Sequence, residues 1–254
     1  MDTFELESEV AAPIQVIGMS YYFDPATSDY GKQHGLNVFE FYGIGRGGVL
    51  GDVNSTTVAE AFWFFHQKAI DGQWNSSSQK VTPTLGAAEH LQAAYQFADR
   101  VLANVPTDVL QAFADAAFKA INTAPLGRYA LADGYRKFPV PSNAIHAAYL
   151  ASIILRELRG GVHIDTTREF NIAANEACYM ANASIFKLHG YSDDDVPEVT
   201  SDLESRMRDA EELTTKTMAS YLDVLSDTER TAFAAGVSAM NDAIVNPPGG
   251  SDSK

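Results

Sequence analysis

The chain has 254 residues, of which 46% are hydrophobic and 20% are charged, as is usual for a globular protein with a substantial core. Its net charge is −15, because 33 acidic residues oppose 18 lysines and arginines, and no basic run occurs. Proteins that bind nucleic acids or anionic membranes need clustered basic residues, so this charge balance argues against both partners.

Cys178 is the single cysteine, which excludes an internal disulfide and a zinc-knuckle pattern. It lies in a helical-looking context, where we expect a small core residue rather than a nucleophile. The first residues lack the basic and apolar parts of a signal peptide, and no stretch approaches the ~20 apolar residues of a membrane span. These features predict a cytoplasmic protein with no metal site and no cofactor.

Apolar residues recur at helical spacing along most of the chain, and only residues 36–42 resemble a strand. The fold class is therefore predicted to be all-α, a multi-helix bundle. Two glycine signals are expected to end helices, Asp71-Gly72 and Gly160-Gly161, and Ser226 with Glu229 forms a capping box. Helices are expected at residues 6–23, 58–70, 83–101, 106–121, 125–136, 143–159, 166–188, 200–213, 214–225 and 227–245.

The stretch from Lys137 to Ser142 contains two prolines within three residues and is the best candidate boundary. It divides the chain into an N-terminal helical half, residues 1–137, and a C-terminal helical half, residues 142–245. The proline- and glycine-rich residues 246–254 are predicted to be a disordered tail.

A G-x-G-x-x-G pattern is formed by Gly43, Gly45 and Gly48. A dinucleotide fingerprint needs a strand before this pattern, a helix that starts within it, and a second strand after it. Residues 51–55 interrupt any helix, and no second strand follows. The glycines are better explained as positions where another helix approaches closely.

Arg46 lies among these glycines, one helical turn after Tyr42. A buried guanidinium must be paired, and its planar fork suits a carboxylate. One interpretation is an anionic ligand held by Arg46. The other is an internal ion pair with Asp52 or Glu60.

An aromatic run, residues 61–66, ends in His66 and is apolar on nearly every side. A helix of this kind belongs in the interior, where an apolar ligand could be held beside His66 by Phe39, Tyr42, Phe62 and Trp63. A histidine on an apolar helix can equally be a core residue with its hydrogen bonds satisfied.

The third candidate cluster comprises Arg156, Arg159 and His163. Arginines in the last turn of a helix are expected from the helix dipole, which explains the two arginines without a ligand. It does not explain His163, which follows the glycines.

These motifs together resemble an actinobacterial all-helical family. The resemblance covers residues 10–225 and is carried by Gly43, Arg46 and the aromatic run to His66, then by residues 155–163 and 189–194. It implies a helix-turn-helix-like fold with a degenerate winged-helix-like second half, in which residues 192–222 are the remnant of the winged helix. The wing region, residues 207–214, is short and acidic, which argues against DNA contact.

Three functions follow from these candidates. The first is a small-molecule-binding protein that no longer reads DNA, with Arg46 and His66 as polar anchors and Arg156 and Arg159 as further ligand-binding candidates. The second is a cofactor-independent enzyme with His66 or His163 as general base and an arginine to stabilise an anionic intermediate. The third is a transcription regulator that binds DNA as a homodimer through residues 142–225.

Overall fold

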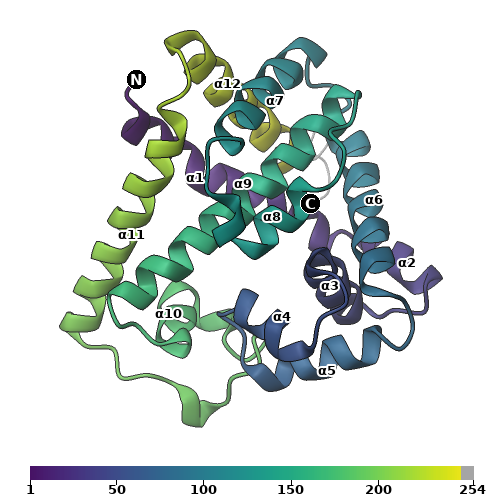
Figure 1. The fold of residues 1–254 in the computed structure, drawn as a ribbon, viewed down its shortest axis with the longest axis vertical. Coiled ribbons are helices and arrows are strands. Elements are labelled where there is room, and N and C mark those ends of the chain that lie inside the picture. Colours follow the sequence, from purple (N-terminus) through teal and green to yellow (C-terminus); the bar gives the residue numbers. More distant parts are fainter. Residues whose placement is uncertain (247–254) are drawn as a thin grey trace, which may run out of the picture. The chain divides into compact units, whose positions relative to one another are not determined.

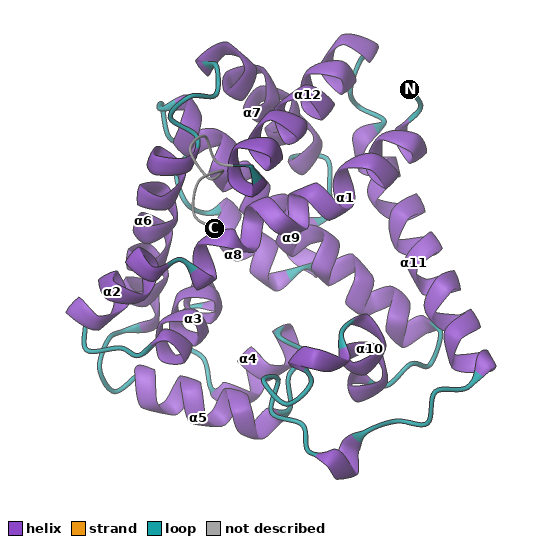
Figure 2. Cartoon of the chain, turned by 180° about the vertical axis from the view of Figure 1, so that it is seen from behind, coloured by secondary structure: helices purple, strands orange, loops and turns teal. Residues whose placement is uncertain are grey.

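The computed structural model describes residues 1–246, and within them the chain forms twelve α-helices and five short 3-10 helices, with no strand (Figure 2). The predicted all-α fold class is thus confirmed. The tail is predicted at residues 246–254, and all of it after Asn246 lies outside the described residues. The helices, labelled in Figure 1, are α1 (Thr3–Met19), α2 (Pro25–Gln33), α3 (Val38–Gly47), α4 (Ser55–Ala61), α5 (Gln67–Ser77), α6 (Pro83–Val101), α7 (Thr107–Ile121), α8 (Ala130–Arg136), α9 (Ala144–Glu169), α10 (Ala174–Ala181), α11 (Ser201–Leu222) and α12 (Asp227–Val245).

Several helices begin at capping boxes, in which a polar side chain accepts from the backbone and a glutamate reaches back to the cap. Asp2 with Glu5 starts α1, Asn37 with Glu40 starts α3, and the predicted box of Ser226 and Glu229 starts α12. These boxes satisfy backbone donors that have no partner within the helix, so the helix starts are encoded locally.

Several expectations are wrong. Residues 38–42 of the strand-like stretch lie in α3, and the helix expected from residue 125 begins only at Ala130. Gly72 lies inside α5, and the break comes earlier, at the turn of residues 62–66. Gly160 and Gly161 lie inside α9, which ends instead at Glu169, two residues before Asn171, whose φ of 51° is left-handed. The expected helix 166–188 is therefore split into the end of α9 and α10, and residues 201–222 form one helix rather than two. A glycine costs about 1 kcal/mol in a helix, which the burial of neighbours such as Leu158 and Val162 outweighs.

The chain separates into two compact units. Unit 1 comprises residues 1–30, residues 91–158 and the chain from residue 215 onward, and unit 2 comprises residues 31–90 and 159–214. The unit boundaries fall within α2, α6, α9 and α11. Each unit thus draws on both the N-terminal half, residues 1–137, and the C-terminal half, residues 142–245, and that division stays a prediction.

In unit 1, α12 packs against both α7 and α1. The contact with α7 is close at Gly236, where an added Cβ would lie 2.3 Å from the Cβ of Phe113. The first half of α9 is buried on every side, with Tyr149, Leu150 and Ile154 fully covered. Such a helix is expected at the centre of a core rather than at its surface.

In unit 2, α5 packs against α3 and α4. A Cβ at Gly45 would lie 2.2 Å from Cγ of His90, and one at Gly48 would lie 2.1 Å from the carbonyl oxygen of Pro83. The G-x-G-x-x-G pattern therefore lets the start and middle of α6 approach α3. Because the pattern begins inside a helix, a phosphate-binding turn after a strand is excluded.

Candidate functional site

Arg46 lies on α3 in a fixed orientation. Its Nη1 donates to the hydroxyl of Tyr42 over 3.0 Å, one turn earlier on the same helix. Its guanidinium carbon lies 4.3 Å from the ring centroid of Phe62, within the range of a cation–π contact. Arg46 and Tyr42 are partly buried, whereas Phe62 is covered. The structure thus brings three of the predicted ligand-binding residues together within unit 2.

Phe65 and His189 extend this arrangement. The Phe65 ring lies 6.0 Å from that of Tyr42 and 5.8 Å from that of Phe62. The His189 imidazole stacks on Phe65, with centroids 3.9 Å apart and an interplanar angle of 17°. We call Tyr42, Arg46, Phe62, Phe65 and His189 the Arg46 cluster.

His189 is held as a neutral ring. Burial lowers its pKa below the usual value, a hydrogen bond to the Phe64 carbonyl raises it, and the positive charge of Arg46 lowers it further. The Phe64 oxygen, 3.2 Å from Nδ1, can only accept, so Nδ1 carries the proton. Two basic groups therefore share the Arg46 cluster, but only Arg46 is charged at neutral pH.

Cys178 lies beside His189 but is not activated by it. Its sulfur is 3.2 Å from His189 Nδ1, which is already the donor to Phe64 and cannot accept the thiol proton. Burial raises the pKa of the thiol to about 11. Cys178 is buried among Phe186, Tyr191 and Tyr179, which agrees with its expected role as a small core residue.

His66 caps a helix instead of ending one. Its Nδ1 accepts from the backbone N–H of Lys68 over 3.2 Å at the start of α5, and its ring packs edge-on against Tyr191, 5.5 Å away. The backbone N–H of His66 donates to the backbone carbonyl of His189 over 2.8 Å. The lone pair that a general base would use at Nδ1 is therefore occupied.

Gly190 permits this junction. Its φ is +91°, and a Cβ there would lie 2.6 Å from Cβ of Ala69. Both features favour glycine, because a side chain would be strained in this region and would also clash. The turn that contains His66 is thereby joined to the chain that follows α10.

His163 and Arg159, both on α9, meet α11 within unit 2. His163 Nδ1 lies 3.0 Å from the Thr214 hydroxyl and 3.5 Å from Glu211 Oε2, and Arg159 forms an ion pair with Glu211. Thr214 donates its own proton to the Ala210 carbonyl, so His163 Nδ1 is the donor and Nε2 keeps the lone pair. Burial lowers the pKa of His163, the Glu211 carboxylate raises it, and Arg159 lowers it.

The remaining residues of the aromatic run contact other parts of unit 2. The Phe64 ring stacks on His163 with centroids 6.0 Å apart, and Trp63 lies 5.2 Å from the guanidinium carbon of Arg168. Trp63 and Phe64 both pack on the core formed by Ile172, Ala177, Leu203 and Ala210. The expected apolar helix of residues 61–66 is instead a turn whose side chains point to several different neighbours.

Two predicted ligand-binding residues lie elsewhere. Phe39, on the first turn of α3, is 47% exposed to solvent. Arg156 belongs to unit 1, where its Nη1 lies 2.6 Å from Glu157 Oε1 and 3.2 Å from the Tyr22 hydroxyl. Arg156 and Arg159 are therefore assigned to different units, although they are three residues apart on α9.

A family model described as a helix-turn-helix family matches residues 8–246. The chain belongs to this helix-turn-helix family. The comparisons with curated proteins and with solved structures found no match to the chain. A fold of this kind is shared by proteins of many functions, so membership establishes the architecture and leaves the chemistry to the site.

In this helix-turn-helix protein, sequence reasoning missed Phe65, His189 and Thr214 as partners of the predicted residues. Thr214 lies within helix α11, and His189 lies in the turn of residues 186–190. His189 comes 124 positions after Phe65, and Thr214 comes 51 positions after His163, so no local spacing marks these contacts. Among residues 1–246, no group of three histidine, cysteine or acidic side chains could hold a metal ion, and no helix has the length and apolarity to cross a membrane.

Proposed function

We propose that the protein binds a small, mostly apolar organic anion, such as an aromatic carboxylate, through the Arg46 cluster, and does not read DNA. The observation that carries the proposal is the orientation of Arg46, held by the Tyr42 hydroxyl at 3.0 Å and the Phe62 ring at 4.3 Å. A guanidinium that is fixed in this way can meet a planar carboxylate with little further loss of side-chain entropy.

The surroundings of Arg46 suit the rest of such a ligand. Tyr42 and Phe65 are partly buried and offer ring surface next to the cation, and His189 adds a neutral ring. Apolar walls with a few convergent polar groups are the usual composition of small-molecule sites. His66 supports the cluster indirectly, as the cap that fixes the turn of Phe62 and Phe65.

Calorimetric titration with benzoate and with cyclohexanecarboxylate tests this function. Arg46→Gln and Phe62→Leu are expected to weaken binding at least ~10-fold, which corresponds to about 1.4 kcal/mol. Arg136→Gln is the matched control, because Arg136 also lies over a phenylalanine, Phe118 at 5.9 Å, but in unit 1. Equal affinity of the wild type and Arg46→Gln for every carboxylate that binds contradicts the proposal.

The accompanying expectations belong to the same proposal. We expect a cytoplasmic protein, with a winged-helix-like second half as in the actinobacterial family that it resembles, and a homodimer is possible in solution. The acidic charge of −15 supports the exclusion of nucleic acid. Fluorescence anisotropy with duplex DNA at two salt concentrations tests the alternative of a transcription regulator, and salt-dependent binding there overturns our first choice.

An enzymatic function is the alternative that one observation favours. His163 is partly buried, has a lowered pKa and keeps the lone pair on Nε2, which are the properties of a general base. If His163 abstracts a proton next to a carboxylate, incubation in heavy water will place deuterium in the ligand, as nuclear magnetic resonance detects. If neither the wild-type protein nor His163→Gln introduces deuterium into the ligand, this reaction is ruled out.

A further inference from the structure

Residues 196–200 of unit 2 connect a short 3-10 helix, Asp193–Asp195, to α11, and we call them the 196–200 linker. Figure 2 draws the linker as part of the loop that runs into one end of α11. Val196 and Val199 are 42% and 47% exposed, and Glu198 is exposed as well. Because successive side chains of an extended segment point in opposite directions, the linker is open to the solvent on both sides.

The backbone of the linker has few local hydrogen bonds. The N–H and carbonyl groups of residues 197–199 bond to no group of residues 1–246. The bonds lie at the ends, where the Asp195 carbonyl accepts from Asn175, and where the Thr200 side chain and carbonyl cap the start of α11. An endopeptidase takes up several residues of its substrate in an extended form, so a helix or a hydrogen-bonded turn must first unfold locally. The 196–200 linker meets this requirement as it stands.

Glu198 is the one glutamate of residues 1–246 that lies outside a helix. Its nearest competitor is Glu169, which is exposed at the last position of α9. The residue after it is held in place, because the Phe170 N–H donates to the Thr166 carbonyl and Arg206 donates to the Phe170 carbonyl. A protease that recognises glutamate therefore finds one bond in this part of the chain that needs no unfolding.

We propose that the Glu198–Val199 peptide bond is a processing site for a glutamate-specific endopeptidase. Water adds across this bond, so that Glu198 gains a terminal carboxylate and Val199 a terminal ammonium group. The exposed Glu198 side chain enters the specificity pocket of the enzyme, which selects the residue before the cleaved bond. Pro197 makes the bond before it a poorer substrate, since proline has a fixed φ and no N–H.

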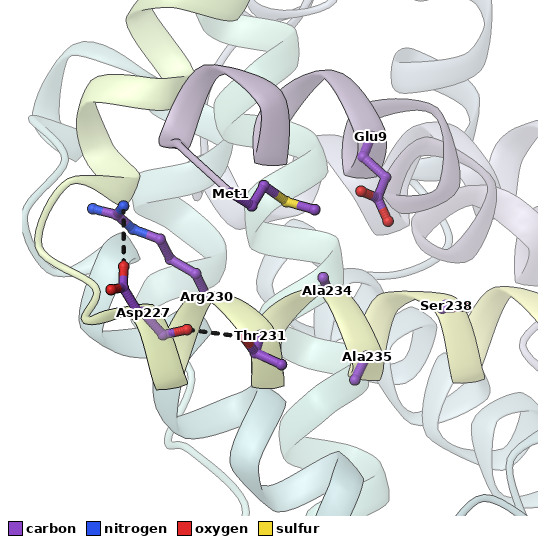
Figure 3. Close-up of a pocket in the computed structure, with 8 residues that line it drawn as sticks. All are labelled: Met1, Glu9, Asp227, Arg230, Thr231, Ala234, Ala235 and Ser238. Atoms are coloured by element: carbon purple, nitrogen blue, oxygen red, sulfur yellow. Dashed lines mark hydrogen bonds and ion pairs between the residues drawn. The ribbon is translucent and has the colours of Figure 1, made fainter.

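The two pieces of the cleaved chain stay together, because the C-terminal piece keeps its packing in both units. The first half of α11 contributes Leu203 and Ala210 to a core with Ile172 and Ala177 in unit 2. In unit 1, α12 packs against α7 and α1, and Figure 3 shows the beginning of α1 beside α12. Cleavage thus removes the covalent connection between α10 and α11 and leaves the contacts of both helices.

Cleavage also bears on His163. Thr214 and Glu211, on the first half of α11, contact its ring. After cleavage the start of α11 is no longer joined to Glu198, so the helix that positions His163 is tethered only from its C-terminal end.

The test is limited proteolysis of the folded full chain with a purified glutamate-specific endopeptidase, followed by mass spectrometry. We expect the first products to be residues 1–198 and 199–254, which elute together in size-exclusion chromatography. Glu198→Gln should slow the first cut at least ~10-fold, since every other glutamate of residues 1–246 must wait for local unfolding. Glu169→Gln, which also removes an exposed glutamate, is the matched control and should leave the first cut unchanged.

Val199→Pro keeps the glutamate but removes the N–H of the cleaved bond, so it separates recognition of the side chain from access to the backbone. We expect this variant to resist the first cut as Glu198→Gln does. The inference is overturned if the first cut of the wild type falls within a helix, if the wild type is cut only after unfolding in urea, or if Glu198→Gln is cut as fast as the wild type.

Discussion

Arg46 in unit 2 and Arg156 in unit 1 have similar local surroundings. Each donates from Nη1 to a tyrosine hydroxyl, over 3.0 Å to Tyr42 and over 3.2 Å to Tyr22, and each lies over an aromatic ring. Arg156 also pairs with Glu157 at 2.6 Å, and the Glu157 side chain is only 1% exposed. In addition, a Cβ at Gly18 would lie 2.8 Å from Cδ of Arg156.

The comparison indicates that a tyrosine and a ring orient an arginine in both units. Arg156 neutralises a buried glutamate and is packed under α1, which makes it part of the core of unit 1. Arg46 lies beside the partly buried rings of Tyr42 and Phe65. We therefore propose a ligand for Arg46 and a structural role for Arg156.

The largest expected effect tests the structural role of Arg156. Glu157→Gln removes a buried carboxylate that pairs with the Arg156 guanidinium and should lower the free energy of unfolding by about 3–5 kcal/mol. Urea denaturation measures this loss. The double variant Arg156→Met, Glu157→Leu should recover much of it, since an apolar pair carries no charge to desolvate.

Asp202→Asn is the control for that series, because its i, i+4 pair with Arg206 is mostly exposed and should be worth less than ~1 kcal/mol. If Glu157→Gln costs no more than Asp202→Asn, the contrast between the two arginines is wrong.

The next effect concerns the glycines around Arg46. Gly45→Ala places a Cβ 2.2 Å from His90 Cγ and should destabilise the protein by roughly 1–3 kcal/mol, since α3 and α6 must move apart. Gly160→Ala, inside α9, meets nothing within 4 Å among the described residues and should stabilise it by up to ~1 kcal/mol. Thermal unfolding of the two variants gives the signs, and the same sign for both contradicts the packing role of Gly45.

Glu40 offers a comparable test, because it joins the start of α3 to the end of α5. Although burial raises its pKa, hydrogen bonds from Lys80 and Ser76 and from the Asn37 backbone lower it from 4.5 to about 2. A lowered carboxyl pKa contributes stability that is present above the ordinary pKa and is lost as the pH falls toward 2. Glu40→Gln should cost roughly 1–3 kcal/mol at pH 7 and flatten the acid loss of stability.

Denaturant midpoints of the wild type and of Glu40→Gln between pH 6 and pH 3 measure that change. Glu169→Gln, an exposed carboxyl at the end of α9, serves as the control. Identical pH profiles for the wild type and Glu40→Gln would falsify the role of Glu40.

The smallest expected effect is a pH dependence from His163. Its lowered folded pKa means that the unfolded chain binds the proton more readily, so stability is complete above the ordinary histidine pKa and falls as the pH drops below it. Glu211→Gln removes the carboxylate that opposes this lowering and should steepen the fall. His163→Phe should reduce the slope of unfolding free energy between pH 7.5 and pH 5.5, and a slope unchanged in both variants rejects the prediction.

Whether a contact of the site could be predicted depends on how far apart its two residues lie in the sequence. Tyr42 and Arg46 are four residues apart on one helix, and their hydrogen bond was foreseeable from helical spacing. His189 meets Phe65, and Thr214 meets His163, across 124 and 51 positions of sequence, where no periodicity applies. His66 was expected within a buried helix because of its aromatic neighbours. Its side chain instead caps the start of α5.

By itself the sequence determined the all-α class, most helix starts and the orientation of Arg46 by Tyr42, because capping and i, i+4 contacts depend on residues within one turn. Tertiary structure alone decided that α9 continues through Gly160 and Gly161, that Arg156 and Arg159 fall into different units, and that His163 and His189 pack against the turn of residues 62–66. These outcomes depend on burial, where apolar contacts from distant segments outweigh a local cost of about 1 kcal/mol per glycine.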